Sequence, residues 1–309
     1  MDVFYYNLSI PLKSSLSHIE QLRRQILLTP ISPKTELRLR WEAMLNRIYW
    51  SLNLSGNPLT KTEMAKLLSG QTKKRLTPAE KEVINYSRAL DYISQEWLVT
   101  GRNIQPKTIL ELYNLACSGR FRDYETNLRQ MLNYLQASSE NPVIQAGSAL
   151  MQLVKLSPFT SENDKVARLL SLLFLYKIGY DFRGMLTIEE YFRHDLTTLE
   201  QVSQVPGGNL TDWLEYYSFG VSQQLEKALE NFDNTNPQNF VPTGFWELND
   251  RQKEVLKILE QPDISITNKA VQKRFKVSQI TASRDLTKLA SLGLIFAHGK
   301  GRSVYYTKV

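Results

Sequence analysis

Residues 157–168, SPFTSENDKVAR, combine small, acidic and basic side chains directly before the apolar run LLSLLFLYKIGY. Such a run predicts a buried helix, and Lys165 and Arg168 would lie near its start. The free backbone N–H groups of a helix N-terminus attract anions, so this loop could bind phosphate. Glu162 and Asp164 add two carboxylates to the same turn, where acidic residues are also ordinary caps and dipole partners. The residue types alone therefore favour a structural role over a phosphate site.

The spacing of this loop resembles that of the Fic family, whose active-site loop reads His-Pro-Phe-x-Asp/Glu-Gly-Asn-Gly-Arg/Lys-x-x-Arg. The matching residues are Pro158, Phe159, Asn163, Lys165 and Arg168. Two further segments agree with the family in order and spacing: SGRFRDYETNLR upstream and KIGYDFRGMLTIEEYFRHD downstream. The resemblance covers roughly residues 35–230 and implies a Fic-type helical fold for this part of the chain.

The same resemblance marks where the loop departs from the family. Most Fic enzymes transfer AMP from ATP to a protein hydroxyl, with the loop histidine as general base. Ser157 stands at that position, and a serine hydroxyl does not exchange protons usefully near neutral pH. Ser161 replaces the carboxylate that would bind Mg²⁺.

The two glycines that wrap the phosphates in the family are Glu162 and Asp164 here. A like-charge pair at about 4 Å costs about 4 kcal/mol near a protein surface, so these carboxylates would repel a triphosphate. We therefore expect no intact catalytic site, no metal and no cofactor. ATP and Mg²⁺ would bind only if the loop were still functional.

A second segment resembles the inhibitory helix of many Fic proteins, which has the pattern Ser/Thr-x-x-x-Glu-Gly-Asn. Its glutamate pairs with the second loop arginine and blocks productive ATP binding. In WSLNLSGNPLTKTEM, Ser51, Gly56 and Asn57 match, and Ser55 stands at the glutamate position. Base, metal ligand, glycines and inhibitory glutamate are thus absent together. The resemblance implies a Fic scaffold that has lost adenylylating chemistry.

The elements around these motifs are predicted to be helices. Apolar residues recur every three or four positions in PKTELRLRWEAMLNRIYW, which is one face of a helix. Thr60 and Thr77 each precede a glutamate by three residues, a capping-box arrangement that marks two further helix starts. The segment NPVIQAGSALMQLVKL predicts another helix, which must end before Pro158.

Positive charge is concentrated at the C-terminal end of the chain. The formal net charge is +7, and residues 246–309 hold 12 Lys/Arg against 6 Asp/Glu. A small basic domain suggests an anionic partner, which is usually nucleic acid. The pattern here is a helix in NDRQKEVLKILEQ, a helix capped by Thr267, a turn, a helix from Ser278 to Gly293, and a hairpin. This order predicts a winged helix-turn-helix.

The third helix of this domain, QITASRDLTKLASLG, is similar to the recognition helices of bacterial winged-helix repressors. Ala282, Leu286 and Leu289 fall on its core side, and Thr281, Arg284 and Lys288 fall opposite. Polar and basic side chains there could reach base edges and phosphates, while the hairpin would contact the DNA backbone. The predicted DNA-binding residues are Gln279, Thr281, Ser283, Arg284, Lys288, Lys300 and Arg302.

The predicted fold class is mainly α, with a Fic-type helical bundle followed by a small α/β winged-helix domain. Residues 1–75 form an N-terminal helical region with the degenerate inhibitory helix, and residues 76–230 form the Fic-like core. The stretch 231–246 is rich in Asn and Pro and predicts a linker. Residues 247–309 form the winged helix-turn-helix domain.

Three functions fit this organisation. The first is a bacterial DNA-binding transcriptional regulator, whose Fic-like body mediates interaction, dimerisation or ligand sensing. The second is a residual or altered nucleotidyltransferase that acts on protein hydroxyls. The third is a scaffold or antitoxin-like module that binds another protein. We favour the first, because the charge excess and the hairpin occur together, and we expect double-stranded DNA as the partner of a homodimer.

The remaining composition bears on location. Cys117 is the single cysteine, so an internal disulfide bond is impossible and a reducing compartment is expected. The first residues, MDVFYYNLSIPLKSS, lack the pattern of a signal peptide, and the longest apolar stretch is too short to span a bilayer. We therefore expect a cytoplasmic protein without a membrane partner.

Overall fold

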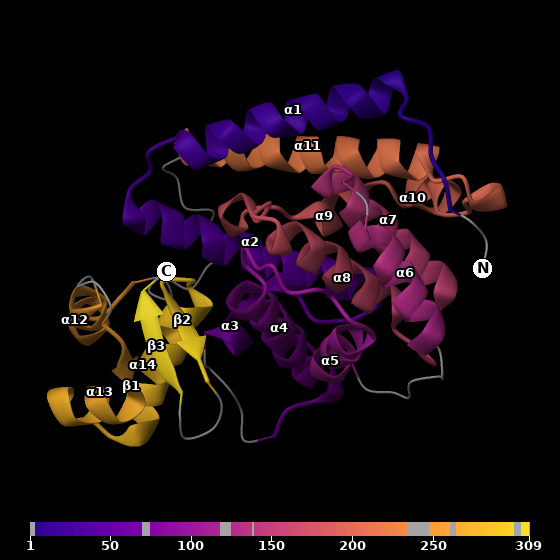
Figure 1. The fold of residues 1–309 in the computed structure, drawn as a ribbon. Helices are drawn as coiled ribbons and strands as arrows, with labels where there is room; N and C mark the ends of the chain where they lie inside the picture. Colours follow the sequence, from indigo (N-terminus) through magenta and orange to yellow (C-terminus); the bar gives the residue numbers. More distant parts are fainter. Residues whose placement is uncertain are drawn as a thin grey trace.

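The computed structural model describes residues 4–69, 75–117, 125–137, 139–233, 247–259, 264–299 and 304–308. Figure 1 shows a large helical body and, at one end of it, a small domain that carries the strands. The body contains α1 (Ile10–Leu28), α2 (Pro33–Leu54), α3 (Lys61–Leu68), α4 (Pro78–Glu96), α5 (Pro106–Ala116), α6 (Glu125–Ala137), α7 (Pro142–Leu156), α8 (Asn163–Lys177), α9 (Ile188–His194), α10 (Leu196–Val202) and α11 (Thr211–Asp233). Two short 3₁₀ turns are η1 (Phe182–Gly184) and η2 (Pro206–Gly208).

Helix α8 forms the centre of the body. Every side chain from Lys165 to Tyr176 is buried, which explains why residues 169–176 are apolar on nearly every side of the helix. It packs along α7 and also contacts α4, α5 and α2. Its first two turns carry Lys165 and Arg168 into the interior, where an unpaired charge costs several kcal/mol. Both cations therefore require partners from the surrounding helices.

Helix α1 lies along α11 on the outer side of the body (Figure 1). Its buried residues recur every three or four positions, and they are Leu12, Leu16, Ile19, Leu22 and Ile26. These side chains belong to the same apolar core as those of α7 and α8. The N-terminal helices therefore share one core with the central helices of the body.

Local sequence signals fix several helix ends. The side chains of Thr60 and Thr77 accept hydrogen bonds from the backbone N–H groups of Glu63 and Glu80, at 3.3 and 3.2 Å. Each glutamate accepts in return from the backbone of its threonine, so both predicted capping boxes are confirmed. Helix α7 ends at Leu156, ahead of the proline, as predicted.

The small domain contains α12 (Asp250–Ile258), β1 (Ile266–Thr267), α13 (Asn268–Phe275), α14 (Gln279–Ser291), β2 (Ile295–His298) and β3 (Tyr305–Lys308). The strands form an antiparallel sheet in the order β1–β3–β2. Thr267 and Ser278 cap α13 and α14, as expected, and Ala282, Leu286 and Leu289 lie in the domain's core. The predicted mainly α fold with a small α/β domain is confirmed.

The small domain is docked on the body through α2 and α4. Leu37 and Trp41 of α2 pack against Leu292, and Leu292 is buried. The side-chain amide of Gln95 on α4 donates to the Ala290 carbonyl at 2.9 Å and accepts from the Ala297 N–H at 3.1 Å. Apolar packing and a two-bond amide clamp thus fix the domain in one orientation.

Helix α11 continues through Asp233, so the first three residues of the predicted linker are helical. The rest of that linker, 234–246, lies outside the described residues. Across the described ranges, none of the helices is both long enough and apolar enough to cross a membrane.

Candidate functional site

The loop between α7 and α8 begins at Ser157, which adopts a left-handed backbone conformation with φ of 46°. Its backbone N–H donates to the Leu153 carbonyl, and its hydroxyl donates to the Val154 carbonyl at 2.7 Å. Both groups therefore complete the C-terminus of α7. The Ser157 hydroxyl, which stands where the Fic loop pattern has its histidine, therefore caps the end of a helix.

Asn163 closes the loop on itself. Its side-chain oxygen accepts from the Phe159 N–H at 2.9 Å, and its side-chain nitrogen donates to the Phe159 carbonyl at 3.0 Å. The buried Phe159 ring stacks on Tyr113 of α5, with 3.8 Å between ring centroids and parallel planes. These contacts hold the loop in a single shape around the start of α8.

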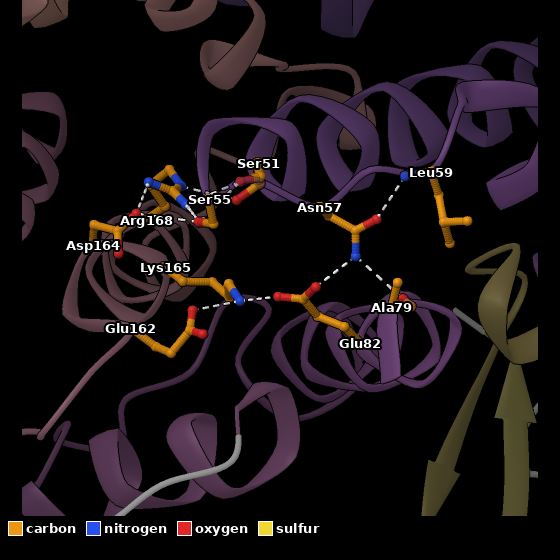
Figure 2. A network of polar contacts seen from close by, with 10 residues as sticks. All are labelled: Ser51, Ser55, Asn57, Leu59, Ala79, Glu82, Glu162, Asp164, Lys165 and Arg168. Carbon is orange, nitrogen blue, oxygen red and sulfur yellow. Dashed lines mark hydrogen bonds and ion pairs between the residues drawn. The ribbon is translucent and has the colours of Figure 1, made fainter. Parts of the chain in front are cut away.

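Lys165 is 1% exposed and forms ion pairs with two glutamates. Glu162 lies one turn away, 2.5 Å from the ammonium group, and Glu82 approaches from α4 (Figure 2). Burial alone would lower the pKa of Lys165, but the hydrogen bonds and charges of both glutamates raise it above its ordinary value. The ammonium group therefore stays protonated, and the carboxylates of Glu82 and Glu162 balance its positive charge within the chain.

Arg168 is also buried, and four hydrogen bonds occupy its guanidinium group (Figure 2). It donates to the Ser51 hydroxyl at 2.8 Å and to the Ser51 carbonyl at 3.0 Å. It donates further to the Ser55 hydroxyl at 2.8 Å and to Asp164 at 2.9 Å. Ser55 in turn donates to the same Asp164 carboxylate at 3.2 Å. Arginine, carboxylate and α2 hydroxyls thus form one closed network.

The end of α2 joins the two ion-pair groups. Asn57 donates to the Glu82 carboxylate at 2.5 Å and to the Ala79 carbonyl, and it accepts from the Leu59 N–H. Gly56 allows the turn before it, because its φ of +84° disfavours a side chain. The structure therefore brings Ser51, Ser55, Gly56 and Asn57 directly to the loop. We call the following set of contacting residues from α2, α4, the loop and α8 the buried ion network: Ser51, Ser55, Asn57, Glu82, Glu162, Asp164, Lys165 and Arg168.

Helix α14 in the small domain has one face that is exposed to solvent. The exposed residues of this helix are Gln279, Ile280, Ser283, Arg284 and Thr287, and we call them the open face of α14. Asn268 at the start of α13 donates to the Gln279 carbonyl at 3.3 Å, which ties the first turns of α13 and α14 together. The open face is free of the body, because it is exposed while the domain is docked.

Two residues of the predicted DNA-binding set lie outside this open face. Thr281 is half-buried and takes part in the cap with Ser278, through its N–H and its hydroxyl. Lys288 is half-buried and donates to the Glu247 carbonyl at 2.8 Å, and burial lowers its pKa. Two further members of the set, Lys300 and Arg302, lie outside the described residues.

Helix α13 adds basic residues that the sequence analysis missed. The exposed cations on this helix and the following turn are Lys269, Lys273, Arg274 and Lys276. They surround Val271, which is buried in the domain core. The signal was present in NKAVQKRFK, where basic residues alternate with a single core position.

Comparison with solved structures identifies the fold of the whole chain. A Fic family protein from Desulfovibrio desulfuricans G20 aligns with a TM-score of 0.59 and 15% identity, over 99% of this chain and 98% of that one. Fic-1 from C. elegans (residues 134–508) aligns with a TM-score of 0.60 and 18% identity, over 71% and 72% of the two chains. The chain has a Fic-type fold. A Fic domain containing signaling protein from Bacteroides thetaiotaomicron also aligns, with a TM-score of 0.56 and 18% identity, over 72% and 96%.

The C-terminal domain of this Fic-fold chain matches a second description. Residues 251–307 match the DeoR-like helix-turn-helix domain family. This match spans α12 through most of β3, so the predicted helix-turn-helix is confirmed. No curated protein sequence matches the chain.

The loop of this Fic-fold chain does not fit a magnesium-bound triphosphate. The buried ion network sets two cations, Lys165 and Arg168, against three carboxylates, Glu82, Glu162 and Asp164. Burial alone would raise the pKa of Asp164, but the charge and hydrogen bond of Arg168 hold it below its usual range. The network is therefore anionic at neutral pH.

A magnesium-bound triphosphate also requires protein ligands for the metal ion. The position expected for the metal-binding carboxylate is the exposed hydroxyl residue Ser161. Within the ranges that the structure describes, no three His, Cys, Asp or Glu side chains are grouped so as to hold a metal ion. Hard divalent cations prefer several oxygen ligands with negative charge, and the three carboxylates of the network are already paired with Lys165 and Arg168.

Sequence reasoning missed Glu82, although it is central to the buried ion network. It lies 83 residues before Lys165 in the chain, on the helix that starts at the Thr77 cap. In the sequence it resembles any surface glutamate of a helix. Only the packing of α4 on α8 shows that it neutralises the loop lysine.

Proposed function

We propose that this protein is a DNA-binding transcriptional regulator whose Fic-fold body no longer transfers AMP. The open face of α14 is the single observation that carries the proposal. It presents Arg284 and hydroxyl and amide groups to solvent while the small domain is docked on the body. In helix-turn-helix proteins the second helix of the motif enters the major groove, and its N-terminal residues meet the bases.

The cations of α13 support this placement. In such motifs the first helix crosses the DNA backbone, and here Lys269, Lys273 and Arg274 lie on that helix and Lys276 directly follows it. Ammonium and guanidinium groups there would contact phosphates and provide affinity without sequence preference. Lys300 and Arg302 would add backbone contacts from the hairpin. These basic side chains of the domain would thus all contact the phosphates of double-stranded DNA.

The open face would then supply sequence recognition. Gln279 lies at the start of α14, where an amide can donate to and accept from one base edge. Ser283 and Arg284 follow one turn later on the same face. Thr281 supports them indirectly, because its cap contact fixes the first turn. Lys288 steadies the docked end of the helix through Glu247 rather than through DNA.

In this proposal the body has no catalytic role and serves to hold the DNA-binding domain in position. The Ser157 hydroxyl caps α7, and the buried ion network occupies both loop cations. We propose further that two chains form a homodimer in the bacterial cytoplasm, which would place two α14 helices on two half-sites. A dimer reads half-sites one helical turn apart, about 34–36 Å between centres.

The test is a titration of the full-length protein with a fluorescent duplex at several salt concentrations. We expect binding at low salt that weakens as salt rises, with log K falling by about 0.9 per phosphate contact for each unit of log salt. Lys273→Ala combined with Arg274→Ala should flatten that slope by about two units, since two contacts are lost. Lys107→Ala on α5 is the control, and its slope should match the unaltered protein.

Absence of binding at low salt would overturn the regulator proposal. The Fic-fold body and its docked domain would then be a scaffold that binds another protein. A salt slope unchanged by the two α13 substitutions would remove these cations from the DNA contact and place the interface elsewhere.

A further inference from the structure

Ile280 is the apolar member of the open face of α14, and its residue is 66% exposed. Ala282, two positions later, is completely buried in the core of the small domain. At about 100° per residue, Ile280 lies roughly 200° around the helix from it, which directs Ile280 away from the core. Its neighbours on the open face are polar or basic. Packing within the chain therefore gives no reason for an isoleucine at this position.

The first turn of α14 holds Ile280 in a defined place. The Ser278 hydroxyl accepts from the Thr281 N–H, and Asn268 of α13 donates to the Gln279 carbonyl. An isoleucine in a helix also has one strongly preferred χ1 rotamer. The side chain is thus a stiff apolar projection at the end of the helix that enters a major groove first.

The major groove offers few apolar groups that such a side chain could contact. Base edges there present hydrogen-bond donors and acceptors, and the exception is the C5-methyl group of thymine. We propose that Ile280 is a specificity-determining residue that packs against the methyl group of a thymine. This inference rests on the proposed DNA-binding function and names part of the sequence that the open face would read.

The position of the thymine within the site follows from Arg284. It lies four residues after Ile280, so the two Cβ atoms are about 5–6 Å apart on one helix face. Successive base pairs are separated by about 3.4 Å. The thymine should therefore lie one or two base pairs from the base or phosphate that Arg284 contacts.

The test removes the methyl group without changing base pairing. The full-length protein first selects preferred sites from a library of duplexes with a randomised centre. Each thymine of a selected site is then replaced singly by deoxyuridine, which pairs identically but lacks the methyl group. We expect one position in each half-site where affinity falls about fourfold, which equals about 0.8 kcal/mol at about 1.4 kcal/mol per tenfold change.

Variants of the protein show whether Ile280 is responsible. With Ile280→Ala, thymine and uracil at that position should bind equally well. With Ile280→Val, which keeps a branched apolar side chain, most of the preference should remain. Leu28→Ala on α1 is the matched control, because Leu28 is 80% exposed and lies outside the small domain, and it should keep the full preference.

The outcomes separate the two proposals. If uracil is tolerated at every position, or if Ile280→Ala keeps the same preference for thymine, the methyl contact is wrong and DNA binding stands. If the full-length protein selects no duplex at all, both the DNA-binding function and the role of Ile280 are wrong.

Discussion

Arg168 of α8 donates a hydrogen bond of 2.8 Å to the hydroxyl of Ser55, the residue that caps the C-terminus of α2. In Fic proteins with an inhibitory helix, a glutamate of that helix pairs with the loop arginine. Here a neutral hydroxyl occupies that place, and Asp164 supplies the negative charge from the adjacent turn of α8. The arginine is therefore bound within the chain and is not presented to a phosphate.

The buried ion network should contribute strongly to stability. Replacing Arg168 with alanine removes four hydrogen bonds and leaves Asp164 with the Ser55 hydroxyl as its remaining side-chain donor among the described residues. The Asp164 side chain is 50% exposed, so water would partly solvate its unpaired charge. Hydrogen bonds to a charged group contribute about 1.5–3 kcal/mol, and we expect a loss of this size in the free energy of urea unfolding. Arg129→Ala is the control, since Arg129 forms an exposed pair with Glu125 within α6 and should cost less than about 1 kcal/mol. Equal losses for both variants would contradict a structural role for the network.

Asp164 should make part of this stability dependent on pH. Its pKa in the folded protein is below the unfolded value, so its contribution is present above the unfolded pKa of about 3.9 and is lost as pH falls through the folded pKa. Asp164→Asn should therefore destabilise the protein at pH near 7, and the difference from the unaltered protein should shrink below pH of about 4. Urea unfolding at several pH values measures this. A difference that stays constant down to the acid limit would show that the charge of Asp164 is unimportant.

Restoring the catalytic base alone should not restore activity. Ser157→His would return an imidazole to the loop, but Glu162 and Asp164 would still hold Lys165 and Arg168. We expect neither the unaltered protein nor this variant to transfer labelled AMP from ATP to itself or to proteins of a lysate. A general base accelerates such reactions by roughly 10²–10⁴, so a working site would be easily detected. Labelling that disappears with Arg168→Ala would show that the loop still binds ATP.

The amide clamp should hold the small domain on the body. Gln95→Ala removes two hydrogen bonds across the contact, and each contributes about 0.5–1.5 kcal/mol. We expect faster hydrogen exchange at the Ala297 N–H, which loses its acceptor, with exchange in α7 unchanged. Gln223→Ala is the control, because Gln223 is exposed on α11 and donates to Glu226 of the same helix, outside the contact between the body and the small domain. Equal exchange at Ala297 in both variants would show that apolar packing alone fixes the domain.

Much of the fold could be predicted from the sequence, because its signals are local. The Thr60 and Thr77 boxes, the Ser278 cap and the core positions Leu286 and Leu289 all depend on residues within a few positions of one another. Local hydrogen bonding and helical periodicity decide such features before any tertiary contact forms. The apolar run after the loop likewise placed Lys165 and Arg168 near the start of α8.

The partners of the loop residues could not be predicted in the same way. Glu82 meets Lys165 across 83 residues of chain, and Gln95 meets Ala290 across 195. Nothing in either sequence neighbourhood distinguishes these side chains from solvent-exposed ones. For Lys288, the helical wheel indicated an outward position, but the packing of the domain brought the Glu247 carbonyl to it. Long-range packing decides such contacts.

The regulator proposal is tested most directly by sequencing the genomic DNA fragments that the purified full-length protein retains from a digest of its source genome. We expect a small number of enriched sites that share a half-site repeated about 10–10.5 base pairs apart, centre to centre. Arg284→Ala should reduce this enrichment, because Arg284 lies on the open face of α14. Retention of fragments in proportion to their abundance in the digest, with no shared sequence and no effect of Arg284→Ala, would contradict the account.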